Sequence, residues 1–171
     1  MDVDHEKIAE HCLNSVTKGR TTFRYNEYFL ANFPEREKFE AQLLQLANLY
    51  LSRTKRDPIK GSHPKLSYWA NVYREGDEHR VHTHGNTIIS GSYYPVLGDP
   101  QYPITFESPW EMWCAWDTID MEDHIANIYP QAGHLLMWPG WLRHAVRKIE
   151  EVIEPRISVS FNISYNLVEI E

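Results

Sequence analysis

The chain has 171 residues, of which 42% are hydrophobic, 24% are charged and 13% are aromatic, and its formal net charge is −7. This length and balance predict one globular domain with a sizeable core, and the aromatic content favours strands around a cavity. The acidic balance and the lack of basic runs argue against a protein that binds nucleic acid through its phosphates.

The beginning of the chain is charged, and the hydrophobic runs elsewhere are too short to cross a bilayer. We therefore expect neither a secretory signal nor a membrane partner. Cys12 and Cys114 lack the spacing of a disulfide framework, so both are expected to be reduced thiols. Together these features predict a cytoplasmic protein. Its oligomeric state cannot be inferred from the sequence.

Helical patterns are confined to the first third of the chain. Asp4 can cap a helix over residues 5–16, and apolar side chains at helical spacing predict a second helix over residues 35–51. Residues 21–29 between them could form a strand. Because residues 1–55 have no core of their own, we interpret them as a helical cover on one face of a sheet.

From residue 66 onward, short segments alternate between polar and apolar residues and are separated by Gly and Pro. Such segments are typical of strands in a sandwich, barrel or jelly roll, and no helical pattern interrupts them. The expected strands are residues 66–74, 79–84, 87–96, 104–107, 124–129, 134–138, 144–149 and 156–167. We predict a mainly β fold with residues 66–170 as its core, and a single domain over residues 1–171.

The last expected strand separates two kinds of side chain. Arg156, Ser158, Ser160 and Asn162 share one face, and the alternating apolar residues of 157–163 share the other. A polar row that faces into a barrel, with an apolar row covered by helices, gives this pattern. A polar row that faces solvent gives it as well, so the alternation alone leaves both arrangements open.

Three histidines at the ends of expected strands are candidate metal ligands. His82 and His84 share one face of a strand, and His144 opens a later strand. Imidazole suits iron, zinc, copper and nickel, and three protein ligands leave positions open for a substrate. Each histidine alone is more simply explained as a surface or core-edge residue, so the metal site is predicted from the set.

Arg156 strengthens this set because it occupies a position that can face inward. A guanidinium binds a carboxylate through two parallel hydrogen bonds, and Ser158 can add a third. This combination suits the far end of a dicarboxylate. The alternative is a structural arginine that pairs at the surface with Glu169 or Glu171.

Five short motifs, in order, resemble the 2-oxoglutarate- and Fe(II)-dependent oxygenases, especially a bacterial and phage subgroup. They lie within about residues 66–165 and are His82-x-His84, SGSYY (90–94), GHLLMWP (133–139), WLRH (141–144) and RISVSFN (156–162), with WAN (69–71) upstream. The resemblance implies a double-stranded β-helix of the jelly-roll or cupin type. It also implies Fe(II), 2-oxoglutarate and O2, with ascorbate as an optional reductant.

Carried over by position, the resemblance implies that His82 and His144 bind iron. Two residues after the first histidine, the commoner pattern has a carboxylate, whereas this chain has His84. We expect His84 to coordinate and to complete a three-histidine site. The alternative is that His84 turns away and that water or Glu107 takes the position.

For the cosubstrate, the resemblance implies that Arg156 and Ser158 hold the distal carboxylate and that Tyr94 donates a hydrogen bond to it. Asn71 or Tyr73 is expected to line the same pocket. The implied reaction is hydroxylation of a small-molecule or peptidyl substrate, with decarboxylation of 2-oxoglutarate to succinate. The sequence does not identify that substrate.

Two other functions share part of this pattern. A cupin-like three-histidine metalloenzyme would keep the barrel and the histidines without using 2-oxoglutarate. A non-catalytic β-barrel would bind a ligand without a metal. Trp110, Trp113 and Trp116 form an aromatic insertion that we attribute to packing rather than to substrate contact, and residues 98–103 are expected to form a mobile loop beside the site.

Overall fold

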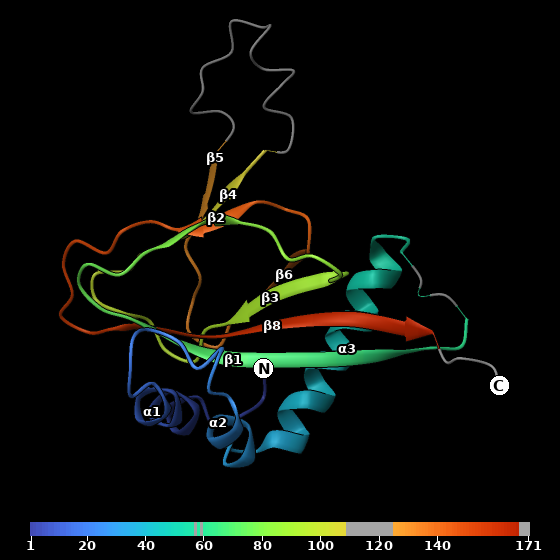
Figure 1. Cartoon of the computed structure of the whole chain (residues 1–171), viewed down its shortest axis with the longest axis horizontal. Helices are drawn as coiled ribbons and strands as arrows, with labels where there is room; N and C mark the ends of the chain where they lie inside the picture. Colours follow the sequence, from blue (N-terminus) through green and yellow to red (C-terminus); the bar gives the residue numbers. More distant parts are fainter. Residues whose placement is uncertain (57, 59, 109–124, 168–171) are drawn as a thin grey trace, which may run out of the picture.

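The structure is a computed structural model that describes residues 1–171 except 57, 59, 109–124 and 168–171 (Figure 1). Within these residues, three helices precede eight strands. The helices are α1 (His5–Ser15), α2 (Glu27–Ala31) and α3 (Arg36–Arg53). The strands are β1 (Ser62–Tyr73), β2 (His79–His82), β3 (Ile89–Tyr93), β4 (Ile104–Glu107), β5 (Ile125–Ile128), β6 (Leu135–Pro139), β7 (His144–Val146) and β8 (Arg156–Leu167).

The strands form two antiparallel sheets. The first sheet has the order β1-β8-β3-β6 and the second has the order β2-β7-β4-β5. Strands that alternate between two such sheets form a jelly roll, so the predicted mainly β fold, a double-stranded β-helix, is confirmed. The eight strands predicted from residue 66 onward differ from the observed ones only at their ends. Residues 109–124 and 168–170 of the predicted core, including His124 at the start of one predicted strand, lie outside the described residues.

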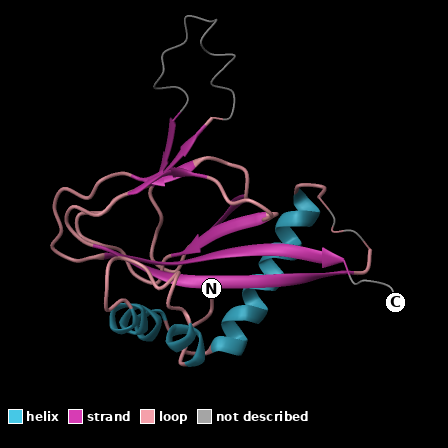
Figure 2. Ribbon diagram, in the orientation of Figure 1, coloured by secondary structure: helices cyan, strands magenta, loops and turns pink. Residues whose placement is uncertain are grey.

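The helices cover the face of the first sheet that is turned away from the second sheet (Figure 2). Helix α1 begins where it was predicted, because the Asp4 side chain accepts a hydrogen bond from the backbone N–H of Lys7 at 3.1 Å. Among the described residues, no helix combines the length and the apolar character that crossing a bilayer requires.

The strand predicted over residues 21–29 is wrong. Thr21 forms an isolated bridge to Asn71, and the chain then turns into α2. The side chain of Asn26 donates a hydrogen bond to the backbone carbonyl of Tyr68 at 2.7 Å, which ties the turn to β1. After this turn, Phe29 lies in α2 and its side chain is fully buried.

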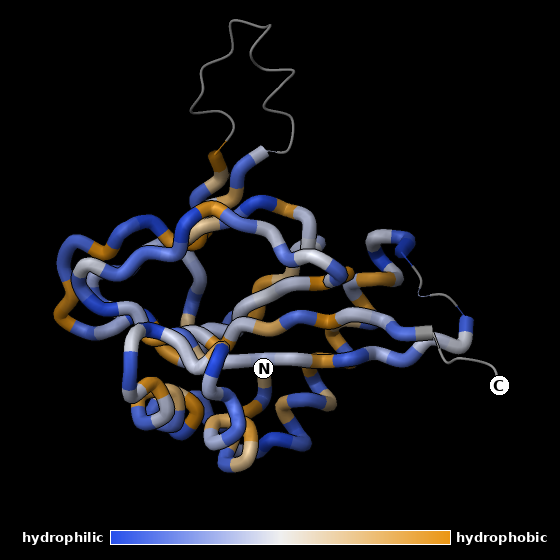
Figure 3. The backbone as a smooth tube through the Cα atoms, in the orientation of Figure 1, coloured by the Kyte–Doolittle hydropathy of each residue, from blue (hydrophilic) through white to orange (hydrophobic). Residues whose placement is uncertain are grey.

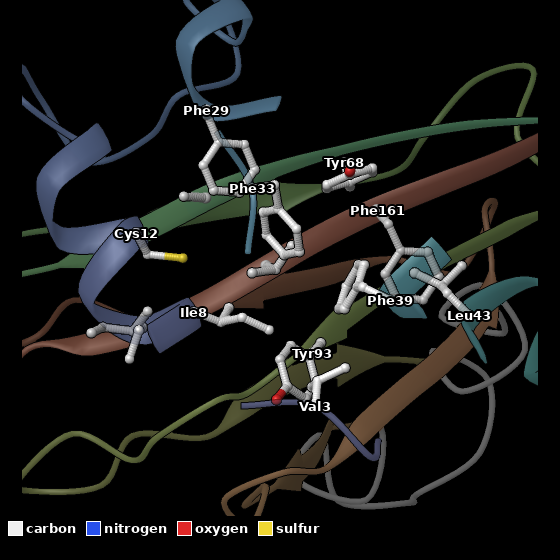
Figure 4. Packing of buried hydrophobic residues seen from close by; sticks show 14 of the residues in the cluster. Val3, Ile8, Cys12, Phe29, Phe33, Phe39, Leu43, Tyr68, Tyr93 and Phe161 are labelled. Carbon is white, nitrogen blue, oxygen red and sulfur yellow. The ribbon is translucent and has the colours of Figure 1, made fainter. Parts of the chain in front are cut away.

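The main core lies between the helices and the first sheet (Figure 4). Along much of the chain, hydrophobic and hydrophilic residues alternate over short distances, as elements with one buried face require (Figure 3). On β8, Ile157, Val159, Phe161 and Ile163 are buried in this core. Arg156, Ser158 and Ser160 instead line a cleft between the sheets. The polar row of β8 therefore faces inward.

Cys12 also belongs to this core, where it is buried and free of any disulfide. Burial raises the pKa of its thiol to about 12, so the thiol is uncharged and unreactive at neutral pH. Cys114 lies outside the described residues.

Gly91 on β3 marks the tightest packing of the first sheet. A Cβ atom at this position would lie 2.1 Å from Cζ of Phe161 and 2.5 Å from the backbone oxygen of Leu136. Gly91→Ala is therefore expected to lower the free energy of unfolding by about 1–3 kcal/mol through overpacking. Urea unfolding measures this loss. Gly85→Ala is the control because nothing lies within 4 Å of its Cβ, and equal stability of the two variants would contradict the prediction.

Candidate metal centre

The cleft between the two sheets encloses about 420 Å³ of space that atoms do not fill, including its opening to solvent. Its lining includes the three predicted histidines, a fourth histidine at position 79, and Arg156. The predicted metal ligands and the arginine predicted to bind a carboxylate therefore line the same cleft.

The strand register brings the predicted ligands together. His82 at the end of β2 lies directly opposite His144 at the start of β7. His84 follows β2, and its backbone N–H donates to the carbonyl of Gly140 at 2.8 Å, which holds it beside the turn that leads into β7. One ring nitrogen from each histidine lies within 4.8 Å of the other two.

The spacing of these nitrogens fits a shared ion. Nε2 of His84 and Nε2 of His144 are 3.3 Å apart. Two nitrogens that bind one ion at about 2.1 Å, with a near-tetrahedral angle between them, lie about 3.4 Å apart. The rings of His82 and His144 are also close, with centroids 4.3 Å apart.

Backbone carbonyls orient two of the three imidazoles. Nδ1–H of His82 donates to the carbonyl of Arg80, and Nδ1–H of His144 donates to the carbonyl of Leu142, both at 2.8 Å. Each of these rings therefore keeps the lone pair of Nε2 for a metal.

Burial lowers the pKa of the histidines in the cleft. The pKa falls to about 4 for His79 and His84 and to about 3 for His144, and it is lowered for His82 as well. Loss of hydration is the main cause, and repulsion from the neighbouring histidines adds to it for all but His82. At neutral pH these imidazoles are uncharged, which is the form that binds a metal.

These shifts predict that the chelated protein loses stability as the pH falls from 7 toward 4. Unfolded histidines take up protons near pH 6.5, whereas the folded ones resist protonation until the pH approaches 4. The unfolded state therefore binds more protons in this window. Urea unfolding at pH 7 and pH 5 measures the loss, and it should be smaller in His144→Gln. An equal loss of stability in His144→Gln would contradict the attribution of this pH dependence to the buried histidines.

Arg156 is buried in the same cleft, with 4% of its surface exposed. Its Nη2 donates to Oη of Tyr94 at 3.2 Å, and its Nε donates to the carbonyl of Tyr102 at 3.3 Å. Its Cζ lies 5.1 Å from the ring centroid of Tyr94 and 5.3 Å from that of Tyr73. Within the described part of the chain it forms no ion pair. A buried cation without a counter-charge is costly, so the cleft favours an anionic ligand.

The other predicted pocket residues divide into two groups. Ser158, Tyr94 and Tyr73 line the cleft. Asn71 is not among the residues that line it; from β1, next to β8, its amide donates a hydrogen bond to Oγ of Ser160 at 2.8 Å. The expectation that Asn71 or Tyr73 lines the pocket is therefore met in geometry by Tyr73, and a cosubstrate-binding role for either residue remains a prediction.

The residues named in the alternative interpretations of the site lie in different parts of the structure. Glu107, the substitute for His84, forms an ion pair with Arg143 at 3.0 Å. Glu169 and Glu171, the surface partners considered for Arg156, lie outside the described residues, as do Trp110, Trp113 and Trp116. The loop over residues 98–103 does lie beside the site, since Tyr102 contacts Arg156. Its mobility remains a prediction.

Three residues of the site were not found from the sequence. The ring of His79 stacks on that of His82 at a centroid distance of 4.0 Å. Trp138 packs against His144, with ring centroids 4.9 Å apart, and its buried Nε1 has no hydrogen-bond partner among the described residues. Nδ2 of Asn162 lies 3.2 Å from Nδ1 of His84. Trp138 lies in the GHLLMWP motif and Asn162 in the RISVSFN motif, but neither motif indicates that these residues contact a histidine.

The solved structures that resemble this chain support the fold. A prolyl hydroxylase from Trichoplax adhaerens, in complex with a peptide fragment of the hypoxia inducible factor oxygen degradation domain, has a TM-score of 0.58 at 12% identity, over 94% of this chain and 77% of that one. HygX from Streptomyces hygroscopicus with iron bound has a TM-score of 0.56 at 10% identity, over 98% and 78%. A Pseudomonas putida prolyl-4-hydroxylase has a TM-score of 0.52 at 15% identity, over 78% and 67%.

No curated protein sequence matches the chain. The family model described as "Putative 2OG-Fe(II) oxygenase" matches residues 67–162, which is more than half of the chain. The matched residues include the three converging histidines and Arg156. The chain therefore belongs to this family of 2-oxoglutarate- and Fe(II)-dependent oxygenases.

Proposed function

We propose that this protein is a 2-oxoglutarate- and Fe(II)-dependent hydroxylase that acts on a peptidyl or small-molecule substrate. One observation carries the proposal: a buried guanidinium that no carboxylate of the described residues neutralises shares a cleft with three converging histidine nitrogens. A three-histidine enzyme that used no dicarboxylate would give Arg156 no function. A barrel without a metal would give the histidines none.

In this proposal His82, His84 and His144 hold the iron. Three neutral imidazoles suit Fe(II) and leave coordination positions for a cosubstrate and for O2. Bound iron, together with 2-oxoglutarate and O2, supplies the oxidising chemistry that yields succinate, CO2 and a hydroxylated substrate. The contribution of the chain is to fix the ligands and to exclude water around them.

Arg156, Tyr94 and Ser158 hold the distal carboxylate in the same proposal. The Tyr94 oxygen accepts a hydrogen bond from Arg156, so its own hydrogen is free to be donated to a carboxylate. Burial raises the pKa of this phenol, which keeps the hydrogen in place at neutral pH. The ring of Tyr73 lies beside the guanidinium and limits its movement.

A peptidyl substrate is supported by the likeness to a prolyl hydroxylase that was solved with a peptide. A small molecule is the other class in the proposal, since the cleft lies between the two sheets and is lined by both polar and aromatic side chains. We propose no nucleic-acid partner, because the chain is acidic. A cytoplasmic location remains part of the proposal.

The direct test is turnover of the cosubstrate. Purified protein is incubated with Fe(II), 2-oxoglutarate, ascorbate and air, and succinate is measured against a His82→Ala sample. Succinate is expected from the wild type alone. Stoichiometric iron without any consumption of 2-oxoglutarate would favour the cupin-like alternative. Failure to retain iron in chelator-free purification would favour the non-catalytic barrel.

A further inference from the structure

The three histidines differ in what contacts their second nitrogen. His82 and His144 each face a backbone carbonyl, which can only accept a hydrogen bond. His84 instead faces the side-chain amide of Asn162, and among the described residues this amide is the one hydrogen-bond partner of its Nδ1. An amide has a donor side and an acceptor side, so it can favour either neutral form of the ring.

The observed hydrogen bonds favour one form of His84. Nδ2–H of Asn162 donates to Nδ1 of His84, so the ring carries its hydrogen on Nε2. That Nε2–H then donates to Nε2 of His144 at 3.3 Å. In this arrangement His84 presents a hydrogen, rather than a lone pair, to the point where the three rings meet.

A metal bound to Nε2 of His84 requires the hydrogen to reside on Nδ1. Asn162 can accept that hydrogen if its amide turns by half a rotation and presents Oδ1. Ser90 supports either orientation: its Oγ–H now donates to Oδ1 of Asn162 at 2.9 Å, and the same oxygen can accept from Nδ2 after the turn. The rearrangement moves no net charge.

We propose that Asn162 is a positioning residue for the third metal ligand, because its amide can accept the hydrogen on Nδ1 of His84 and so leave Nε2 free to bind the metal. The inference rests on the metal centre proposed above and adds a residue to it. The contact also links the two sheets, since Asn162 belongs to β8 of the first sheet and His84 follows β2 of the second. Ser90 and Asn162 are direct register partners on neighbouring inner strands, so the pair is rigidly held.

The test is the affinity of the protein for Co(II), measured by titration of its visible absorption, which needs no catalytic turnover. Asn162→Leu has a similar size but no acceptor for Nδ1–H, so binding should weaken about 10–100-fold, as is typical when a hydrogen-bond partner of a ligating histidine is lost. Asn162→Asp offers an acceptor in either orientation, so it should bind at least as tightly as the wild type.

Asn127→Leu is the matched control. Oγ1 of Thr105 donates to Oδ1 of Asn127 at 2.8 Å, and these residues are register partners in the second sheet, as Ser90 and Asn162 are in the first. Among the described residues, neither side chain of this pair forms a hydrogen bond with His82, His84 or His144. Its Co(II) affinity should equal that of the wild type.

A double-mutant cycle with His84→Ala separates positioning from packing. In the His84→Ala protein, Asn162→Leu should cause no further loss of Co(II) affinity, because the residue on which it acts is gone. The same loss in both backgrounds would overturn the inference, as would an Asn162→Asp protein that binds as weakly as Asn162→Leu. If His84→Ala leaves Co(II) affinity unchanged, the three-histidine centre itself is wrong, and this inference fails with it.

Discussion

His144→Ala is expected to abolish tight binding of Fe(II) or Co(II). His144 is buried, and its ring centroid lies 4.3 Å from that of His82 and 5.1 Å from that of His84, so it is close to both of the other proposed ligands. Removal of a direct ligand should cost more than the roughly 100-fold that loss of an outer hydrogen bond can cost. Metal content after dialysis and a Co(II) titration measure the effect.

Two further histidine variants make this result specific. His63→Ala removes an exposed histidine of β1 and should leave metal binding unchanged. His79→Ala removes the ring that stacks on His82 but does not belong to the converging group, so the metal should be retained. Loss of the metal in His79→Ala, with retention in His144→Ala, would place the centre on a different set of ligands.

Arg156→Ala is expected to keep the metal and to weaken 2-oxoglutarate by about 2 kcal/mol or more, which is a rise in Kd of about 30-fold. The variant removes a buried cation that no described carboxylate neutralises. Arg156→Lys should recover only part of the affinity, because an ammonium cannot bind a carboxylate through two parallel hydrogen bonds. Anaerobic titration of 2-oxoglutarate into the iron-loaded protein measures Kd.

Arg80→Ala is the control for this experiment. Its side chain is 89% exposed and pairs with Glu78 outside the cleft, so its removal should leave the affinity for 2-oxoglutarate unchanged. An unaltered affinity in Arg156→Ala would mean that the dicarboxylate does not bind at this guanidinium, whatever the outcome for the histidines.

The strands were predictable because alternation of polar and apolar residues directly reflects which face of a strand is buried. On β8 this alternation located the apolar row in the core and the polar row in the cleft. The segment over residues 21–29 was not predictable in this way. Its apolar residues suit a strand, but a contact from Asn26 to Tyr68, distant in sequence, ends the pairing and starts a helix.

The metal centre was partly predictable, because His82 ends one strand, His144 begins another, and both lie within recognisable motifs. His79 was missed for a definite reason. Strict alternation would direct His79 and His82 to opposite faces, whereas an irregularity in the pairing of β2 with β7 between them brings the two rings together. The role inferred for Asn162 depends on which side chain meets it across the cleft, and spacing along the chain carries no such information.

Because the three proposed ligands are uncharged, they have a consequence for the electrostatics of the whole cleft. A divalent ion held by His82, His84 and His144 would keep its full charge, since no carboxylate of the described residues belongs to this group, and Arg156 adds another positive charge in the same cleft. A doubly charged cosubstrate neutralises only part of this sum. The remaining positive potential, little screened in a low-dielectric interior, attracts further anions and disfavours cationic groups near the open coordination positions.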